Sequence, residues 1–232
     1  MSGNAPVPRP LHSLASEMSH PSTDLESHMS EHHAEEPLPR TTLPGAHIAD
    51  PAPLGLAAFA LTTAVLSAVN AGWVPDTVEP VVFGLALAYG GIGQFAAGMW
   101  EFAKGNTFGA TAFSSFGAFW VSFWWLTGHS GMDKVPAADA AKGVGLYLLV
   151  WGIFTAYMTV ASTRVSGAVM VVFVLLTLTF LVLSWGEFAT SDGIHKIGGY
   201  LGLLTALAAW YASFAGVTAF THKRQLLPVG SR

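Results

Sequence analysis

Six stretches of about twenty or more uncharged residues occupy most of the chain between residues 51 and 222. A helix needs about 20 residues to cross roughly 30 Å of hydrocarbon, so each stretch is long enough to span a membrane. Only 10% of the 232 residues are charged, whereas an average soluble domain contains about 25%. The sequence therefore predicts an all-α, polytopic membrane protein with six transmembrane helices, and it excludes a soluble domain.

Charged and turn-forming residues mark the expected ends of these helices. We expect the spans at about residues 53–73, 81–102, 107–126, 143–162, 165–185 and 197–220. The longest connection, residues 127–142, is expected to be a polar loop. Several tryptophans lie near these ends, where their amphipathic rings favour the headgroup level of a bilayer: Trp73, Trp100, Trp124, Trp125 and Trp185.

The residues before the first span have a different composition. Residues 1–48 are rich in Pro, Ser, His and Glu, and such a segment buries too little apolar surface to offset its ordering entropy. We therefore predict a disordered N-terminal tail at 1–48, a six-helix transmembrane transport domain at 49–222 and a short C-terminal tail at 223–232. The tail holds a cluster of potential metal ligands, which we interpret as solvated because an unstructured chain fixes no ligand geometry: His28, Glu31, His32, His33, Glu35 and Glu36. No metal or other cofactor is expected.

An even number of spans places both termini on the same side of the membrane. The basic residues expected on that side are Arg40, Lys104, Arg164, Lys223 and Arg224, against Lys134, Lys142 and Lys196 on the other. The positive-inside rule therefore favours a multi-pass protein of the cell membrane with cytoplasmic termini.

The first span opens with a helix-start motif made of Asp50, Pro51, Pro53 and Gly55. Asp is a good N-cap residue, and Pro suits the first helical position. Helix starts here and at Thr107 present positive dipole ends, which transporters can aim at anionic groups.

No Lys or Arg lies inside an expected span, so an anion at membrane depth would meet only uncharged donors and helix ends. The candidate substrate path consists of Gln94, Asn106, Thr107, Thr111, Ser114 and Ser115, with Asn70 as a further donor. The alternative is that the hydroxyl groups bond carbonyls one turn back or hold helices together.

Two glutamates end spans beside a tryptophan or a Trp-Gly pair, namely Glu101 and Glu187. Each is either an interfacial carboxylate, with Lys104 one turn from Glu101, or a member of a proton relay. His129 and His195 are expected to face solvent in loops. Small residues at a spacing of four predict close helix packing at Gly198, Gly202 and Ala206.

Ordered motifs give the chain a family resemblance. The sequence reads DPAPLGL at 50–56, YGG at 89–91, GMWEF at 98–102, GNTFGAT at 105–111 and GGYLGL at 198–203. The first resembles the NPAPLGL signature of the acetate uptake transporter family, of the succinate–acetate permease type, and the others resemble further blocks of that family. The resemblance extends over roughly residues 50–220.

The resemblance implies a six-helix protomer that assembles as a hexamer and moves acetate, other small monocarboxylates and sometimes succinate with protons. It also implies an apolar constriction made by a Phe, a Tyr and a Leu, which correspond to Phe59, Phe116 and Leu176. Two positions depart from the family pattern. Phe116 lacks the usual tyrosine hydroxyl, and Asp50 replaces the usual asparagine.

We therefore expect a proton-linked membrane permease or channel for acetate-like carboxylates. A second hypothesis is an ammonia or ammonium pathway, because an apolar constriction also suits a small neutral solute. A third is a membrane sensor or scaffold that signals through its tail. An enzyme is not expected, because no paired carboxylates, metal-ligand spacing or nucleophile–base set falls at membrane depth.

Overall fold

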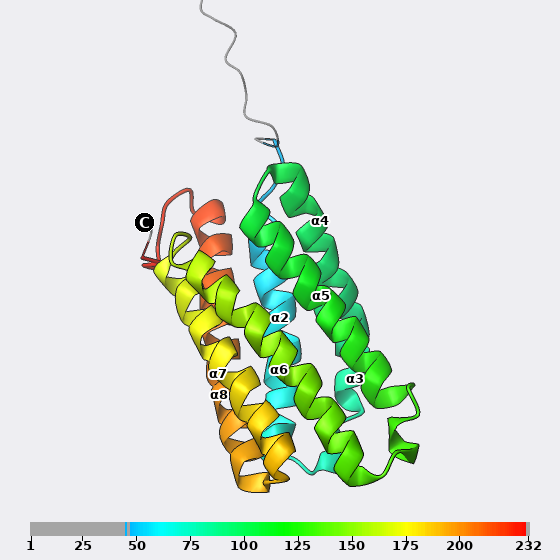
Figure 1. Ribbon diagram of the computed structural model, residues 1–232. Helices are drawn as coiled ribbons and strands as arrows, with labels where there is room; N and C mark the ends of the chain where they lie inside the picture. Colours follow the sequence, from blue (N-terminus) through cyan, green and yellow to red (C-terminus); the bar gives the residue numbers. More distant parts are fainter. Residues whose placement is uncertain (1–44, 46, 231–232) are drawn as a thin grey trace, which may run out of the picture. The chain divides into compact units, whose positions relative to one another are not determined.

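The computed structural model describes residue 45 and residues 47–230. Most of the predicted tail, including the histidine and glutamate cluster at 28–36, therefore lies outside the described residues. The described chain is nearly all helical (Figure 1): α2 (Ala52–Asn70), α3 (Val81–Leu87), η3 (Ala88–Gly93), α4 (Gln94–Lys104), α5 (Thr107–Gly128), α6 (Ala137–Ser162), α7 (Gly167–Ala189) and α8 (Asp192–Thr221). Two short 3-10 helices, η2 (Asp76–Val78) and η4 (Met132–Lys134), lie in the connections.

The helices have the lengths that a membrane requires. α3, η3 and α4 form one helical segment, Val81–Lys104, and this segment together with α2, α6, α7 and α8 is long and apolar enough to cross a bilayer. α5 has 22 residues and completes the set of six long segments, although its threonines, serines and glycines make it less hydrophobic. The predicted all-α polytopic membrane fold is confirmed.

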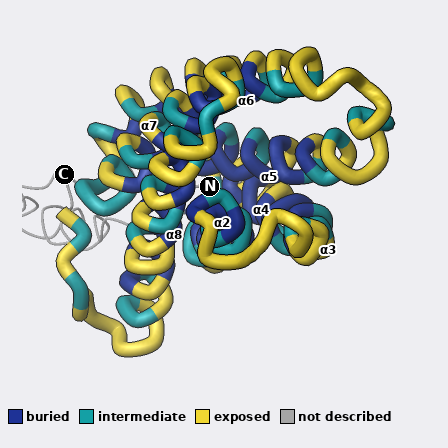
Figure 2. Tube along the Cα trace, turned by 90° about the horizontal axis from the view of Figure 1, so that it is seen from below, coloured by how far each residue is buried: buried dark blue, intermediate teal, exposed yellow. Residues whose placement is uncertain are grey.

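Successive long helices run in alternate directions, and they pack as neighbours in a specific order. α8 lies between α2 and α7, α6 packs on α7, and α4 packs on α5 (Figure 1). Figure 2 shows buried residues concentrated on α2 and α5, whereas the outer turns of α6 and α8 are exposed. Exposed apolar side chains on these outer turns, such as Val150, Ile153 and Leu207, suit contact with lipid tails.

Glycines on α8 bring that helix close to α2 and α7. A Cβ atom on Gly199 would lie 2.3 Å from the Ala71 backbone nitrogen, and one on Gly202 would lie 2.1 Å from Ser67 Oγ. Gly198 faces Leu183 in the same way, at 2.5 Å. The predicted close packing of this small-residue face is confirmed.

Some predicted boundaries were wrong. α6 begins at Ala137 and α8 at Asp192, so the loop predicted at 127–142 is shorter than expected. Charge in the first turns misled the prediction, because an Asp near a helix N-terminus complements the helix dipole. Asp139 occupies such a turn and pairs with Lys142 at 3.2 Å.

The helix start at α2 also differs slightly from the prediction. Pro51, rather than Asp50, precedes the first helical residue. The Asp50 carboxylate nevertheless accepts a hydrogen bond from the Ala52 N–H at 3.2 Å and pairs with Lys104 Nζ at 2.7 Å. It therefore ties the start of α2 to the end of α4.

Candidate substrate pathway

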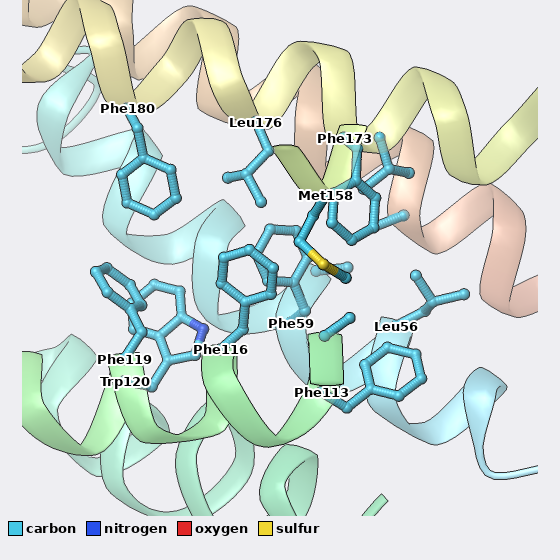
Figure 3. Close-up of a cluster of buried hydrophobic side chains, with 14 of the residues drawn as sticks. Leu56, Phe59, Phe113, Phe116, Phe119, Trp120, Met158, Phe173, Leu176 and Phe180 are labelled. Atoms are coloured by element: carbon cyan, nitrogen blue, oxygen red, sulfur yellow. The ribbon is translucent and has the colours of Figure 1, made fainter. Parts of the chain in front are cut away.

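Three side chains from three helices meet inside the bundle. Phe59 of α2, Phe116 of α5 and Leu176 of α7 are each less than 5% exposed, and Figure 3 shows them close together, pointing toward one another. The ring centroids of Phe59 and Phe116 are 6.0 Å apart. The structure thus brings together the three residues that the resemblance assigned to a constriction, and we call this set the constriction.

Phe116 lies within a larger aromatic cluster. Its ring centroid is 5.4 Å from that of Phe154, 6.0 Å from Phe173 and 6.1 Å from Trp151. Tilted and edge-on contacts of this kind fix ring positions through their quadrupoles. The constriction is therefore packed against apolar groups, and the side chains of its three members contain no polar atom.

Cavities lie on both sides of the constriction. A small one of about 20 Å³, roughly the space of one water molecule, is lined by all three constriction residues and by Gln94. A larger one of about 280 Å³, which we call the inner chamber, is lined by Phe59 and Leu176 and extends toward the connections that join α2 to α3 and α7 to α8. Phe59 and Leu176 line both cavities, so their side chains separate the two spaces.

The inner chamber adjoins a wider space at the end of the bundle. This outer vestibule has a volume of about 860 Å³ and is lined by residues of 69–79 and 186–196. Four residues line both the vestibule and the chamber, and we call them the neck: Asn70, Glu79, Glu187 and His195. Vestibule, neck, chamber and constriction thus lie in series.

The prediction that His195 faces solvent was wrong. Its side chain is only 31% exposed, and its Nε2 lies 2.9 Å from Glu187 Oε1. The cause is the short turn of Thr190 and Ser191 between α7 and α8. Thr190 adopts the left-handed conformation with φ 46°, and the Ser191 N–H bonds the Gly186 carbonyl at 3.0 Å.

Glu79 is the second carboxylate of the neck and lies just before α3. Burial raises the pKa of Glu79, and the nearby charges of Asp76 and Glu187 raise it further, while His195 acts in the opposite direction. The group therefore takes up a proton at a higher pH than an exposed glutamate does.

Glu101 lies at the opposite end of the bundle and is completely buried. Its Oε2 accepts a hydrogen bond from Asn106 Nδ2 at 2.9 Å, and Asn106 Oδ1 accepts one from the Gly109 N–H at 3.2 Å. Asn106 is thus the N-cap of α5 and the partner of Glu101. The expected partner, Lys104, pairs with Asp50 instead, so the reading of Glu101 as an interfacial carboxylate beside Lys104 was wrong.

The other predicted path residues are spread along α4 and α5. Gln94 is buried and lines the small cavity. Ser114 lies where α5 packs tightly on α4, because a Cβ on Gly98 would be 2.5 Å from its backbone nitrogen. Thr111 and Ser115 are half-buried, and Thr107 is exposed at the start of α5.

The sequence reasoning missed polar residues that line the inner chamber. Thr63 and Trp120 are 6% and 2% exposed, and both line it. Thr63 Oγ1 and Trp120 Nε1 are buried and have no hydrogen-bond partner in the described part of the chain. Each lies four residues after a constriction residue, one turn along the same helix face, and this spacing was the signal that could have identified them.

Comparison with known proteins identifies the family of this chain. The profile of the GPR1/FUN34/yaaH family matches residues 35–229. Acetate permease A of Emericella nidulans is 43% identical over 195 residues, which are 78% of this chain and 65% of that relative. Ammonia transport outward protein 2 of Saccharomyces cerevisiae is 43% identical over 175 residues, which cover 73% of this chain and 61% of that protein. This chain therefore spans less than two thirds of the length of these fungal relatives.

Bacterial relatives match over nearly their whole length. The succinate-acetate/proton symporter SatP of Escherichia coli is 36% identical over 79% of this chain and 96% of its own length. The solved structure of the bacterial acetate channel SatP superposes with a TM-score of 0.72 at 36% identity, and the match covers 79% of this chain and 99% of that one. The chain belongs to the GPR1/FUN34/yaaH family.

Proposed function

We propose that this protein moves acetate and related small carboxylates, including succinate, across a membrane together with protons. The observation that carries the proposal is the series of vestibule, neck, inner chamber and constriction inside a membrane-spanning bundle. Relatives named acetate permease and succinate-acetate/proton symporter support the choice of substrate.

The chemistry of the pathway suits a small acid. The chamber, at about 280 Å³, lies near the lower limit of typical small-molecule pockets, which start at about 300 Å³. Apart from the neck residues, the described residues that line it have apolar or uncharged polar side chains. An ionised carboxylate is costly in such a place, so passage of the acid with a proton is the favoured route.

Some of the predicted site residues take roles in this proposal, whereas Asn106, Thr107, Thr111, Ser114 and Ser115 line none of its cavities. Phe59, Phe116 and Leu176 form the size-selective barrier, and Gln94 offers an uncharged polar group beside it. Of the two relay candidates, Glu187 lines the pathway, whereas Glu101 is enclosed at the turn between α4 and α5. We therefore keep the relay role for Glu187.

We further propose cytoplasmic termini, from the positive-inside rule, and a hexameric assembly, from the family resemblance. We expect transport and no catalysis. Cross-linking in native membranes tests the hexameric assembly. The accessibility of single cysteines introduced near either end of this cysteine-free chain tests the side on which the termini lie.

Uptake by purified protein in liposomes tests the function. Labelled acetate should enter faster than in protein-free liposomes, and an acidic exterior should accelerate it further. A second candidate function, an ammonia or ammonium pathway, is favoured by the named yeast relative. Uptake of labelled methylammonium without uptake of acetate would establish that alternative and exclude the first.

A further inference from the structure

The neck is the boundary that a solute crosses between the outer vestibule and the inner chamber. Asn70, Glu79, Glu187 and His195 line both spaces, so any passage between them brings the solute against these side chains. Glu79, Glu187 and His195 are therefore the carboxylate and imidazole groups that line the chamber. The other described residues of its lining are uncharged.

Two of the neck charges form a pair, and one does not. Glu187 and His195 are 2.9 Å apart, so their charges cancel when the imidazole is protonated. Glu79 forms no hydrogen bond or ion pair through its side chain with the residues that the structure describes. Asp76 of η2, Glu187 of α7 and His195 of α8 line the vestibule together with it, and their charges act on it.

The remaining charged groups of the vestibule do not neutralise Glu79. Asp192 and Lys196 on α8 line the vestibule but not the neck. The Lys196 stem lies along the backbone at Gly72, with Cε 3.2 Å from the position of a Cβ there. An ionised Glu79 therefore leaves a net negative charge at the entrance to the chamber, and burial strengthens its field.

Beyond the neck, the chamber offers unused hydrogen-bonding groups. Thr63 Oγ1 and Trp120 Nε1 are buried, line the chamber and have no partner among the described residues. The indole N–H is a donor only, and the hydroxyl group both donates and accepts. The oxygen atoms of a carboxyl group can accept hydrogen bonds from these donors. A carboxylate solute can therefore bind in the chamber, beyond the neck.

We propose that Glu79 is a specificity-determining residue that admits a carboxylate to the inner chamber only together with a proton. When ionised, Glu79 repels the carboxylate anion. When protonated, its O–H donates a hydrogen bond to a carboxylate oxygen, so that Glu79 and the solute share one proton from the vestibule water. This inference rests on the proposed transport of carboxylates and assigns the proton dependence of that transport to one side chain.

Glu79→Gln tests the role because glutamine keeps the size and a hydrogen-bond donor but cannot ionise. Acetate influx into proteoliposomes is measured from mildly acidic to neutral pH and corrected for protein-free liposomes. The variant should exceed the wild type by about tenfold at neutral pH, in the range by which charge alters association, and should match it in acid. His195→Gln should lower acetate influx below that of the wild type at neutral pH, because it leaves the negative charge of Glu187 without its positive partner.

Asp133→Asn is the matched control, since it removes an exposed carboxylate of η4 that lines none of the cavities described above, and it should keep the wild-type pH profile. Two results would overturn the proposal. One is a Glu79→Gln profile parallel to that of the wild type. The other is a folded Glu79→Gln protein that is slower at every pH, which would make Glu79 a proton donor or a structural residue.

Proton uptake separates failure of this inference from failure of the transport function. Acetate is added to the detergent-solubilised protein in weak buffer with a pH indicator near neutral pH. The wild type should take up protons as acetate binds, and Glu79→Gln should not. Wild-type acetate influx equal to that of protein-free liposomes would refute the transport function, whereas the absence of acetate-linked proton uptake by the wild type would refute the role of Glu79.

Trp120→Phe extends the test to the chamber. The change removes the unpartnered N–H and should raise the acetate concentration for half-maximal influx about tenfold, as expected for a lost hydrogen bond to a charged or shared-proton group. Trp185→Phe, at a tryptophan 63% exposed on α7, is its control. An unchanged half-maximal concentration in Trp120→Phe would exclude the indole from the site.

Discussion

Glu187 Oε1 and His195 Nε2 lie 2.9 Å apart across the turn between α7 and α8, and Gly186 provides the room for this contact. A Cβ atom on Gly186 would lie 2.8 Å from His195 Cδ2 and 3.2 Å from the His195 backbone nitrogen. The pair at the neck therefore depends on a residue without a side chain one position before the glutamate.

We expect Gly186→Ala to displace the His195 ring and weaken the pair. The melting temperature should fall by about 2–4 °C, the shift that about 1 kcal/mol produces in a chain of this size. The control is Gly193→Ala at the start of α8, where the nearest atom would be 3.9 Å from the new Cβ. Thermal unfolding in detergent measures both melting temperatures. An equal fall in the two variants would contradict a specific role of Gly186 in the pair.

Leu176→Ala should widen the constriction, because the leucine side chain separates two cavities. The uptake of propionate relative to acetate should rise by about tenfold, the order of discrimination that one methylene gives in an apolar site. Succinate should gain as well. Leu178→Ala on the same helix, where the side chain is 44% exposed, is the control, and an unchanged preference in Leu176→Ala would count against a gating role.

The sequence, through its family resemblance, predicted that Phe59, Phe116 and Leu176 lie together, and the structure shows them close to one another inside three long helices. Their role as a constriction stays a prediction. Sequence reasoning failed at His195, because nothing in the hydropathy of residues 186–196 indicates that Thr190 takes a left-handed conformation and reverses the chain within two residues. Contacts made by short turns depend on backbone angles, and a hydropathy pattern does not encode them.

Glu79 should make stability depend on pH. Its pKa is raised in the folded state, so the folded protein binds the proton more tightly than the unfolded chain does. Stability then falls as the pH rises from the ordinary glutamate pKa through the raised one. Glu79→Gln should therefore melt at a higher temperature than the wild type near neutral pH and at the same temperature in acid. A difference that persists in acid would show a cause other than ionisation.

Asp50→Asn should affect transport more than stability. Asp and Asn are equivalent helix caps, but the change releases the Lys104 charge that now pairs with Asp50 at 2.7 Å. We expect acetate uptake to rise about threefold at low salt and neutral pH through electrostatic attraction, and the gain to disappear at high salt. Equal uptake by both proteins at every ionic strength would leave Asp50 with a structural role only.

Deletion of residues 2–46 should leave a folded and active protein. The composition of this segment gives it no means of forming a core, and the described residues that line the constriction, chamber and neck all lie after it in the chain. Acetate uptake per molecule, at matched expression in the membrane, should equal that of the full chain. Loss of uptake with normal insertion would favour the sensor hypothesis.

The carboxylates show a second limit of sequence reasoning. Glu101 and Lys104 stand at helical spacing, yet Lys104 pairs with Asp50 from another helix, and Glu101 pairs with Asn106 beyond the turn. Local spacing predicts which residues share a face, whereas partners from distant segments depend on how helices approach each other. Local spacing could have identified the chamber residues Thr63 and Trp120, because each follows a constriction residue by one helical turn.

A constriction whose side chains hold no polar atom, with phenylalanine at position 116, has a consequence for the order in which solutes cross. None of these three side chains can replace the water that a solute sheds, so the barrier height follows the partitioning of each protonated acid from water into hydrocarbon. Among acids narrow enough to fit, rates should therefore increase with oil solubility, and a hydroxyl group on the solute should slow its passage more than an added methyl group does.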